Sequence, residues 1–365
     1  MDRRVIMIMA GGTGGHVYPA LAVAGELREA GHTVIWMGTR KGLEARVVPA
    51  AGIAVEWLSV AGIRGKGVMG LLKAPLMLMR ALKQSWTILR RVRPDVVLGM
   101  GGFVSGPGGL IARWSGIPLV LHEQNRVPGT TNRLLARRAS VVLEAFPDSF
   151  PTSVGARVTG NPLRREIAAL AGVERQRPKA EPLRVLIVGG SLGAKALNDI
   201  VPAALGLIRQ PLMIRHQTGQ ALRDETAARY HEQGLAAEVT AFVEDMAAAY
   251  QWADLAICRS GAMTVSELAA AGLPAILVPY PHAIDDHQTA NAHVLADDGA
   301  AVLMPQANLT PESLATVLRS LLDEPETLSA MSQAARLKAR PEAAKTVAAV
   351  CLAAVADAPK NEDNP

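Results

Sequence analysis

Cysteine, aromatic residues and long apolar runs are all scarce in this chain. Its 365 residues include two cysteines, Cys258 and Cys351, which lie far apart in apolar surroundings. This usage argues against a disulfide framework or a cysteine metal site and predicts two buried thiols. No apolar run approaches the ~20 residues that a spanning helix needs. The first residues lead into a strand pattern without a small-residue cleavage site, so we expect no signal peptide and a cytoplasmic protein.

The charge balance is only weakly basic, with a formal net charge of +5. An excess of this size is compatible with anionic lipid, nucleic acid or a phosphorylated substrate, so only its distribution along the chain is informative. The chain is too long for one comfortable core and suits two domains of ordinary size.

Two parts of the chain begin with the same pattern, an apolar strand that runs into a glycine-rich loop and then a helix. Val5–Ala10 precedes the loop GGTGGH, and Leu183–Val188 precedes the loop GGSLGA. Neither loop has the spacing of a dinucleotide fingerprint or the lysine of a P-loop. Further short apolar runs predict the remaining strands: Thr33–Met37, Asp95–Leu98, Pro118–His122 and Ala139–Leu143, then Met213–His216, Glu238–Phe242, Leu255–Cys258 and Ala275–Val278.

This alternation predicts an α/β protein with two Rossmann-like, doubly wound domains that face each other across a cleft. The expected boundaries are an N-terminal domain over residues 1–163, a C-terminal domain over 164–340, and a final helix with a disordered tail over 341–365. We expect the tail to begin near Ala358.

The stretch Cys258–Gly272 predicts an anion site. A polar turn follows the strand, and an alanine-rich helix then runs until Gly272 stops it. The start of such a helix offers unpaired N–H groups and a partial positive charge to a phosphate. Glu267, inside the helix, can accept the two hydroxyls of a ribose. The alternative is a capping box over residues 264–267, in which Glu267 only ties back the helix start.

Polar side chains at the predicted strand ends are candidates for chemistry. His16 lies in the first glycine-rich loop, where an imidazole can deprotonate a hydroxyl or merely hold the loop. His122, Glu123 and Asn125 follow another strand and either face a substrate or satisfy one another. Gln288 lies one helical turn from Asn291, and such amides suit sugar hydroxyls.

Two further stretches have open interpretations. The neighbouring Asp285, Asp286 and His287 match no zinc or calcium spacing, so we predict no metal site. Val68–Arg93 alternates apolar and basic residues at roughly helical spacing. Such a helix either packs on the sheet with a solvated basic face or lies in a membrane interface among anionic headgroups.

Taken in order, seven motifs resemble the MurG family of bacterial glycosyltransferases: GGTGGH, GMGGFVSGPGG, LHEQN, GNPLR, GGSLGA, CRSGAMTVSELAAAG and DDHQTAN. The resemblance runs from about Val5 to about Pro305. It implies the GT-B architecture, with the lipid acceptor in the first domain and the sugar donor in the second. The implied reaction is inverting transfer of N-acetylglucosamine from UDP-N-acetylglucosamine (UDP-GlcNAc) to the 4-hydroxyl of the muramoyl sugar of undecaprenyl-linked lipid I, which gives lipid II for peptidoglycan.

The resemblance also implies a location and partners. We expect a peripheral protein on the cytoplasmic face of the inner membrane, in contact with anionic lipids. Proteins of cell-wall synthesis are possible partners, with roles in cell shape and division, and nucleic acid is not expected. No cofactor is expected, because the helix start and Arg164 can stabilise a diphosphate without a metal.

Site residues follow from the same resemblance. His16 is the expected general base, with Glu123 or His122 as alternatives. The implied donor-binding residues are Thr13, Gly14, Gly15, Asn125, Arg164, Ser191, Val243, Ala262, Met263, Thr264, Val265, Ser266, Glu267 and Gln288.

Three other functions remain open at this point. A UDP-GlcNAc 2-epimerase has the same architecture and donor site but no use for a lipid acceptor. A nicotinamide-dependent oxidoreductase is suggested only by the doubly wound pattern, without its fingerprint. A non-catalytic nucleotide-binding module predicts UDP binding without turnover.

Overall fold

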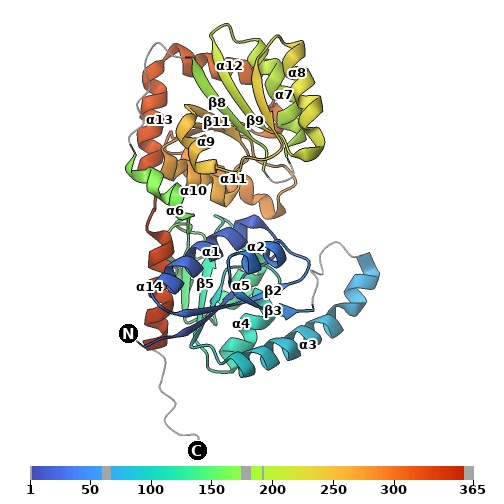
Figure 1. Cartoon of the computed structure of the whole chain (residues 1–365), viewed down its shortest axis with the longest axis vertical. Helices are drawn as coiled ribbons and strands as arrows, with labels where there is room; N and C mark the ends of the chain where they lie inside the picture. Colours follow the sequence, from blue (N-terminus) through green and yellow to red (C-terminus); the bar gives the residue numbers. More distant parts are fainter. Residues whose placement is uncertain (1, 60–66, 174–181, 191–192, 357–365) are drawn as a thin grey trace, which may run out of the picture. The chain divides into compact units, whose positions relative to one another are not determined.

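The computed structural model describes residues 2–59, 67–173, 182–190 and 193–356 (Figure 1). The predicted donor residue Ser191 and the predicted disordered tail lie outside these ranges. The chain divides into two compact units. One unit combines Met1–Arg164 with Glu342–Pro365, and the other is Arg165–Pro341.

The first unit is built on a seven-stranded parallel sheet, in the order β3-β2-β1-β4-β5-β6-β7. Its strands are β1 (Val5–Met9), β2 (Thr33–Thr39), β3 (Ala54–Leu58), β4 (Val96–Gly99), β5 (Leu119–Glu123), β6 (Val141–Glu144) and β7 (Arg157–Val158). Its helices are α1 (Gly14–Glu29), α2 (Glu44–Ala50), α3 (Gly67–Val92), α4 (Ser105–Trp114), α5 (Thr130–Ala136) and α14 (Ala343–Ala356), with a short 3₁₀ turn at Thr152–Val154.

Alternate residues of β1 face opposite sides of this sheet, as the pleat of a strand requires. Ile6 and Ile8 belong to a buried cluster with α1 and α14, whereas Met7 and Met9 belong to another with α3 and α4. Both faces are therefore covered, which explains why the strands read as continuous apolar runs. Full burial of each such side chain contributes about 1.5–3 kcal/mol.

The second unit has a six-stranded parallel sheet, in the order β10-β9-β8-β11-β12-β13. Its strands are β8 (Leu183–Val188), β9 (Leu212–Gln217), β10 (Ala237–Thr240), β11 (Leu255–Cys258), β12 (Ala275–Leu277) and β13 (Ala301–Leu303). Its helices are α6 (Arg165–Ala168), α7 (Lys195–Gly206), α8 (Arg223–Glu232), α9 (Met246–Trp252), α10 (Ala262–Ala271), α11 (His287–Ala296), α12 (Pro311–Asp323) and α13 (Pro325–Leu337), with 3₁₀ turns at Ala169–Gly172, Gln220–Leu222, Ile284–Asp286 and Gln306–Asn308.

The two sheets confirm the predicted α/β class with two Rossmann-like domains. In each sheet the strand order reverses next to its first strand, between β1 and β4 and between β8 and β11. Open α/β sheets bind ligands beyond the carboxyl ends of the strands at this point. The glycine-rich loops after β1, β4 and β8, and the turn after β11, all start there.

Three strands were absent from the prediction, and each is short or poorly buried. β3 is mostly half-buried, β7 has two exposed residues, and β13 has three residues. Both cysteines are buried and unpaired, as predicted, and burial raises the pKa of each thiol to about 12. No helix in the described part of the chain is long and apolar enough to cross a membrane.

Candidate active site

Two glycine-rich loops of the first unit touch at the end of the sheet. A Cβ atom on Gly102 would lie 2.4 Å from the carbonyl oxygen of Gly11, and Gly102 has a φ of +80°. Only glycine permits both the approach and this conformation. The buried Glu44 holds the first loop by accepting a hydrogen bond of 3.0 Å from the N–H of Gly12.

His16 lies in the first turn of α1 and is half-buried. Its Nδ1 atom is 2.8 Å from Oε1 of Gln124. A Cβ atom on Gly101 would lie 2.9 Å from Cε1 of His16, so the second loop packs directly against the imidazole. The ring is thereby held between the end of β5 and the loop after β4.

The other two candidate bases of this unit are buried. Glu123 accepts four hydrogen bonds, two at each oxygen, from Asn125 (N–H and side chain), Gly129 and Asn132. The Nε2 atom of His122 is 2.9 Å from the carbonyl oxygen of Gly160. Burial lowers the pKa of His122 to about 4, so its ring is neutral near pH 7.

Four of the predicted donor residues of the first unit lie at or near the start of α1. Thr13 is exposed, and its hydroxyl makes no capping hydrogen bond to α1. Gly14 and Gly15 open that helix, one turn ahead of Tyr18. The guanidinium carbon of Arg164 lies 5.8 Å from the centroid of the Tyr18 ring.

In the second unit, α10 begins at Ala262, with Gly261 as its N-cap. Thr264 is therefore inside the helix, and the capping box considered for residues 264–267 does not form. Glu267 lies in the second turn, half-exposed, and its Oε2 accepts a hydrogen bond of 2.9 Å from the hydroxyl of Tyr250 in α9. Gly272 ends the helix in the left-handed conformation, as predicted.

The start of α10 is tied to the start of α11. The hydroxyl of Ser260 donates to the carbonyl oxygen of Gln288 over 2.8 Å, and the buried Asn291 donates to the carbonyl oxygen of Ser260. The Oε1 atom of Gln288 accepts from the N–H of Tyr280, and no hydrogen bond within the described residues uses its Nε2 atom. Gln288 thus has a donor to offer beside the helix start.

The glycine-rich loop after β8 is pinned by Gln217, at the end of β9. Its side chain accepts from the N–H of Gly190 and donates to the carbonyl oxygens of Gly190 and Ala241. Val243 follows β10 and is half-buried, and no backbone hydrogen bond of Val243 occurs within the described chain. Its peptide groups are available to a ligand.

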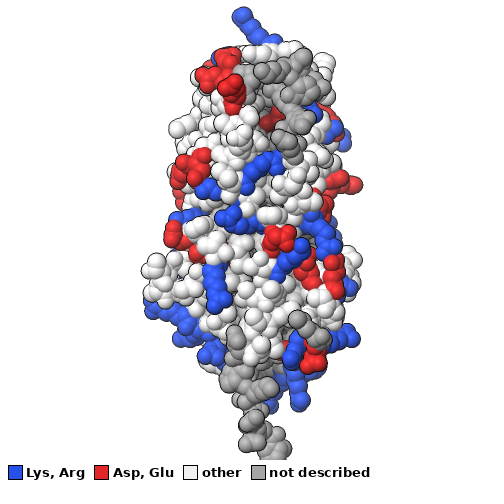
Figure 2. Space-filling model, turned by 90° about the vertical axis from the view of Figure 1, so that its left-hand side faces the viewer, with Lys and Arg blue, Asp and Glu red and all other residues white. Residues whose placement is uncertain are grey.

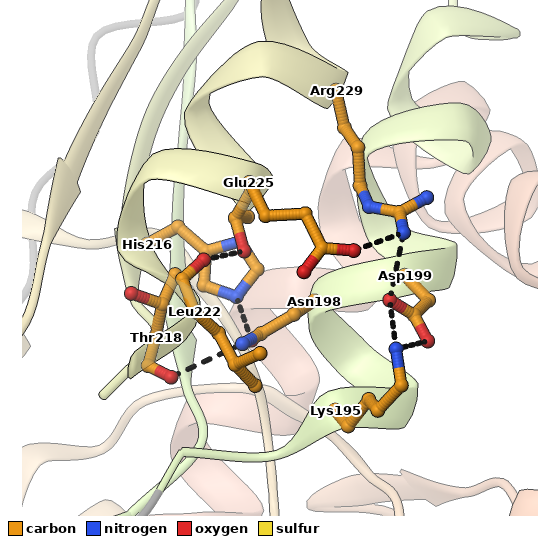
Figure 3. A network of polar contacts seen from close by, with 9 residues as sticks. Lys195, Asn198, Asp199, His216, Thr218, Leu222, Glu225 and Arg229 are labelled. Carbon is orange, nitrogen blue, oxygen red and sulfur yellow. Dashed lines mark hydrogen bonds and ion pairs between the residues drawn. The ribbon is translucent and has the colours of Figure 1, made fainter. Parts of the chain in front are cut away.

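Buried polar side chains lie behind this loop, and Figure 3 shows part of their network, around His216, Asn198 and Thr218. His216 contacts the hydroxyl of Tyr230 at 2.9 Å and Oδ1 of Asn198 at 3.0 Å, and Asn198 donates to the carbonyl oxygen of Thr218. Burial lowers the pKa of His216 to about 3, so the ring is neutral. A Cβ atom on Gly193 would lie 1.9 Å from the Thr218 oxygen, so the network supports the loop from beneath.

Comparison with known proteins identifies the family. The N-terminal domain model of glycosyltransferase family 28 matches residues 6–144, and the C-terminal domain model matches residues 184–347. A Methylococcus capsulatus protein named UDP-N-acetylglucosamine--N-acetylmuramyl-(pentapeptide) pyrophosphoryl-undecaprenol N-acetylglucosamine transferase is 63% identical over 96% of this chain and 99% of its own length. A crystal structure of MurG from Acinetobacter baumannii matches with a TM-score of 0.82 at 43% identity, over 96% of this chain and 99% of that one. The chain belongs to the MurG family, within glycosyltransferase family 28.

More distant neighbours share only the fold with this MurG-family chain. A UDP-N-acetylglucosamine 2-epimerase structure matches with a TM-score of 0.67 at 16% identity, over 100% of this chain and 99% of that one. At 16% identity the structural similarity shows a shared fold and does not indicate a shared activity. The residues matched by the N-terminal domain model include the strand reversal between β1 and β4, and those matched by the C-terminal model include the reversal between β8 and β11.

Several residues that hold the candidate site residues in place were not predicted from the sequence: Glu44 and Gln124 in the first unit, and Gln217 and Tyr250 in the second. Gln124 stands in the LHEQN motif at a strand end, which is a usable signal. The others act through partners distant in sequence, and local patterns do not report such contacts.

Within the described residues, no group of three or more His, Cys, Asp or Glu side chains is placed to hold a metal ion. On the face shown in Figure 2, basic and acidic side chains are interspersed.

Proposed function

We propose that this chain transfers N-acetylglucosamine from UDP-GlcNAc to the 4-hydroxyl of the muramoyl sugar of lipid I, giving lipid II for peptidoglycan. The observation that carries this proposal is the 63% identity, over 96% of the chain, to the Methylococcus capsulatus transferase of that name. The N-terminal and C-terminal domain models of family 28 both match, which supports the proposal because the chain carries both domains of such an enzyme.

We place the UDP donor chiefly on the second unit. The first amides of α10 and its partial positive charge suit the diphosphate, which assigns residues 262–266 to that role. Tyr250 orients Glu267, whose carboxylate suits the ribose hydroxyls. Val243 offers peptide groups to the uracil, and Gln288 offers an amide donor to the sugar. The remaining proposed donor contacts are Thr13, Gly14, Gly15, Asn125, Arg164 and Ser191.

His16 is the general base in this proposal. The acceptor hydroxyl gives its proton to the imidazole as its oxygen bonds to the anomeric carbon. The bond from that carbon to the UDP phosphate oxygen breaks, and UDP leaves with the electron pair, which inverts the configuration. Glu123 is the weaker candidate, because its four accepted hydrogen bonds and burial suit it to holding the loop.

We also propose peripheral attachment to the cytoplasmic face of the inner membrane, through α3 and α4. Large apolar side chains are exposed there, with Leu76 at 67%, Met79 at 61% and Trp114 at 68%. The guanidinium of Arg90 stacks over the ring of Trp86, 4.4 Å from its centroid. Basic and aromatic residues on one amphipathic element suit an anionic lipid surface, where the acceptor resides.

The deciding experiment measures transfer of labelled N-acetylglucosamine from UDP-GlcNAc to a lipid I analogue. The unaltered protein should form product. His16→Ala should lower kcat by ~10²–10⁴-fold with donor binding intact, because a general base contributes that much. Glu267→Ala should weaken donor binding instead.

The exposed Gln233, at the end of α8, gives a control variant, Gln233→Leu, that should match the unaltered protein. A folded, unaltered protein that binds UDP-GlcNAc but forms no product contradicts the transferase assignment. Release of UDP without any acceptor would then favour the epimerase.

A further inference from the structure

The side chain of Gln124 links the two histidines of the first unit. It is 1% exposed and lies at the end of β5. Its Nε2 atom is 3.0 Å from Nδ1 of His122 and 3.1 Å from the His122 carbonyl oxygen. Its Oε1 atom is 2.8 Å from Nδ1 of His16.

The orientation of this amide follows from its neighbours. A backbone carbonyl oxygen only accepts hydrogen bonds, so the amide group that faces the His122 carbonyl must be the NH₂. The amide oxygen of Gln124 therefore faces His16. Because the amide is buried, reversing it would set two acceptors against each other without water to separate them.

The protonation of His122 agrees with this orientation. Its Nε2 atom faces the carbonyl oxygen of Gly160 at 2.9 Å and must carry the ring proton. Its Nδ1 atom is then the unprotonated nitrogen and accepts from Gln124. Burial, which lowers the pKa of His122 to about 4, keeps the ring in this neutral form near pH 7.

The orientation of the Gln124 amide determines which ring nitrogen of His16 carries the proton. An amide oxygen accepts, so Nδ1 of His16 must donate, and in the neutral ring the lone pair lies on Nε2. No hydrogen bond within the described residues involves that Nε2 atom. The contact with Gly101 restricts the ring from the other side.

We propose that Gln124 is a positioning residue, oriented by His122, which holds His16 in the tautomer whose Nε2 lone pair receives the proton of the acceptor hydroxyl. The proposal rests on the proposed function, with His16 as base. An imidazole with its proton on Nε2 has no lone pair there to receive another. Gln124 therefore acts on the rate of the chemical step through His16, without touching the substrate.

The test uses three variants of the full chain. Gln124→Leu keeps the approximate volume and removes all three hydrogen bonds of the side chain. Gln124→Glu retains an oxygen that accepts from Nδ1 of His16 and, as the carboxylic acid that burial favours, an O–H that donates to His122. Gln233→Leu is the matched control, because it makes the same exchange on an exposed residue of the second unit.

Two readouts separate positioning from structure. Nitrogen NMR of protein with labelled histidine distinguishes protonated from unprotonated ring nitrogens, and His16→Ala identifies the signals of His16 among the eight histidines. Steady-state kinetics with UDP-GlcNAc and a lipid I analogue separate kcat from KM.

We expect the unaltered protein to carry the His16 proton on Nδ1. Gln124→Leu should shift the proton toward Nε2 and lower kcat on the order of 10–100-fold, with KM for UDP-GlcNAc changed less than about twofold. Gln124→Glu should restore the tautomer and most of kcat. A proton on Nε2 of His16 in the unaltered protein overturns the proposal, as does a Gln124→Leu variant with unchanged tautomer and kcat. Absence of transfer by the unaltered protein rejects the proposed function instead, while the NMR measurement still decides the tautomer.

Discussion

Two glutamates near the proposed site show how surroundings divide one residue type between two roles. Glu123 is buried, and both of its oxygens accept two hydrogen bonds, so its carboxylate fixes the loop that begins at Asn125. Glu267 is half-exposed on α10 and is oriented by the hydroxyl of Tyr250. The first is suited to structure and the second to holding a ligand.

Removing the hydroxyl of Tyr250 tests the orientation of Glu267. Tyr250→Phe deletes one hydrogen bond to a charged acceptor, worth about 1.5–3 kcal/mol, while keeping the buried ring. We expect UDP-GlcNAc to bind roughly ten-fold more weakly by titration calorimetry, with kcat nearly unchanged. Glu267→Gln, which retains the shape, is the comparison variant and should weaken donor binding at least as much. Unchanged binding in both variants would contradict the ribose role of Glu267.

Single residues also show what the sequence could and could not reveal. His16 and Asn125 were predicted as site residues because the sequence shows polar side chains that follow an apolar strand, and Gln288 because it lies one helical turn from Asn291. Their partners were not predicted, since the contact of His16 with Gln124 spans 108 positions along the chain. The capping box at residues 264–267 was excluded only by the start of α10 at Ala262, which no local pattern specifies.

Among the elements, α3 differs from the helices that are buried against the sheets. Its described part carries exposed Leu76, Leu78 and Met79, while Ala81 and Leu89 are buried in the core of the first unit. The sequence left two interpretations open, a helix packed on the sheet or a helix at a membrane. The helix packs with one side and leaves apolar residues exposed on another, so the two interpretations are compatible.

Polar substitution on α3 tests the proposed membrane contact. The double variant Leu76→Gln with Met79→Gln removes exposed apolar area and leaves the buried residues of the helix intact. We expect flotation with vesicles that contain anionic lipid to fall several-fold, because interfacial binding scales with buried apolar area. Transfer to a soluble acceptor analogue should be unaffected. The exposed Leu207 of the second unit supplies the control, Leu207→Gln, which should float like the unaltered protein.

At the scale of the whole molecule, each unit carries a buried neutral histidine, and this makes the protein sensitive to acid. Burial lowers the folded-state pKa of His122 to about 4 and of His216 to about 3. A histidine in the unfolded chain has a pKa of about 6.5, so between these folded-state pKa values and pH 6.5 the unfolded chain binds more protons than the folded one. The stability that these groups contribute is therefore complete above about pH 6.5 and is lost as the pH falls through that window.

Chemical denaturation at pH 7.5 and 5.5 checks this dependence. Each histidine should account for a loss of about 1 kcal/mol in the free energy of unfolding, since one pH unit corresponds to ~1.4 kcal/mol per proton. His216→Gln keeps a donor and an acceptor but does not titrate. The free energy of unfolding of this variant should therefore fall by about 1 kcal/mol less between the two pH values than that of the unaltered protein. An equal loss in this variant and the unaltered protein would contradict the assignment.

Much of the architecture was visible in the sequence, because buried parallel strands followed by glycine-rich loops form a distinctive pattern. The short edge strands β3, β7 and β13 were not predicted, since few of their residues are buried on both faces. The sequence also did not predict which sheet α14 packs against. Its alanine-rich sequence shows a helix but not the sheet that it covers.

The packing of α14 against β1 and α1 affects how the chain folds while it is being synthesised. Val347, Ala348, Cys351 and Ala354 of α14 are buried in the same cluster as β1 and α1 of the first unit. The ribosome must therefore translate all of Arg165–Pro341 before it makes the helix that completes the core begun at Val5. The second unit is an uninterrupted stretch of sequence that can fold as it emerges, whereas the unit that is made first keeps an apolar face exposed until α14 leaves the exit tunnel.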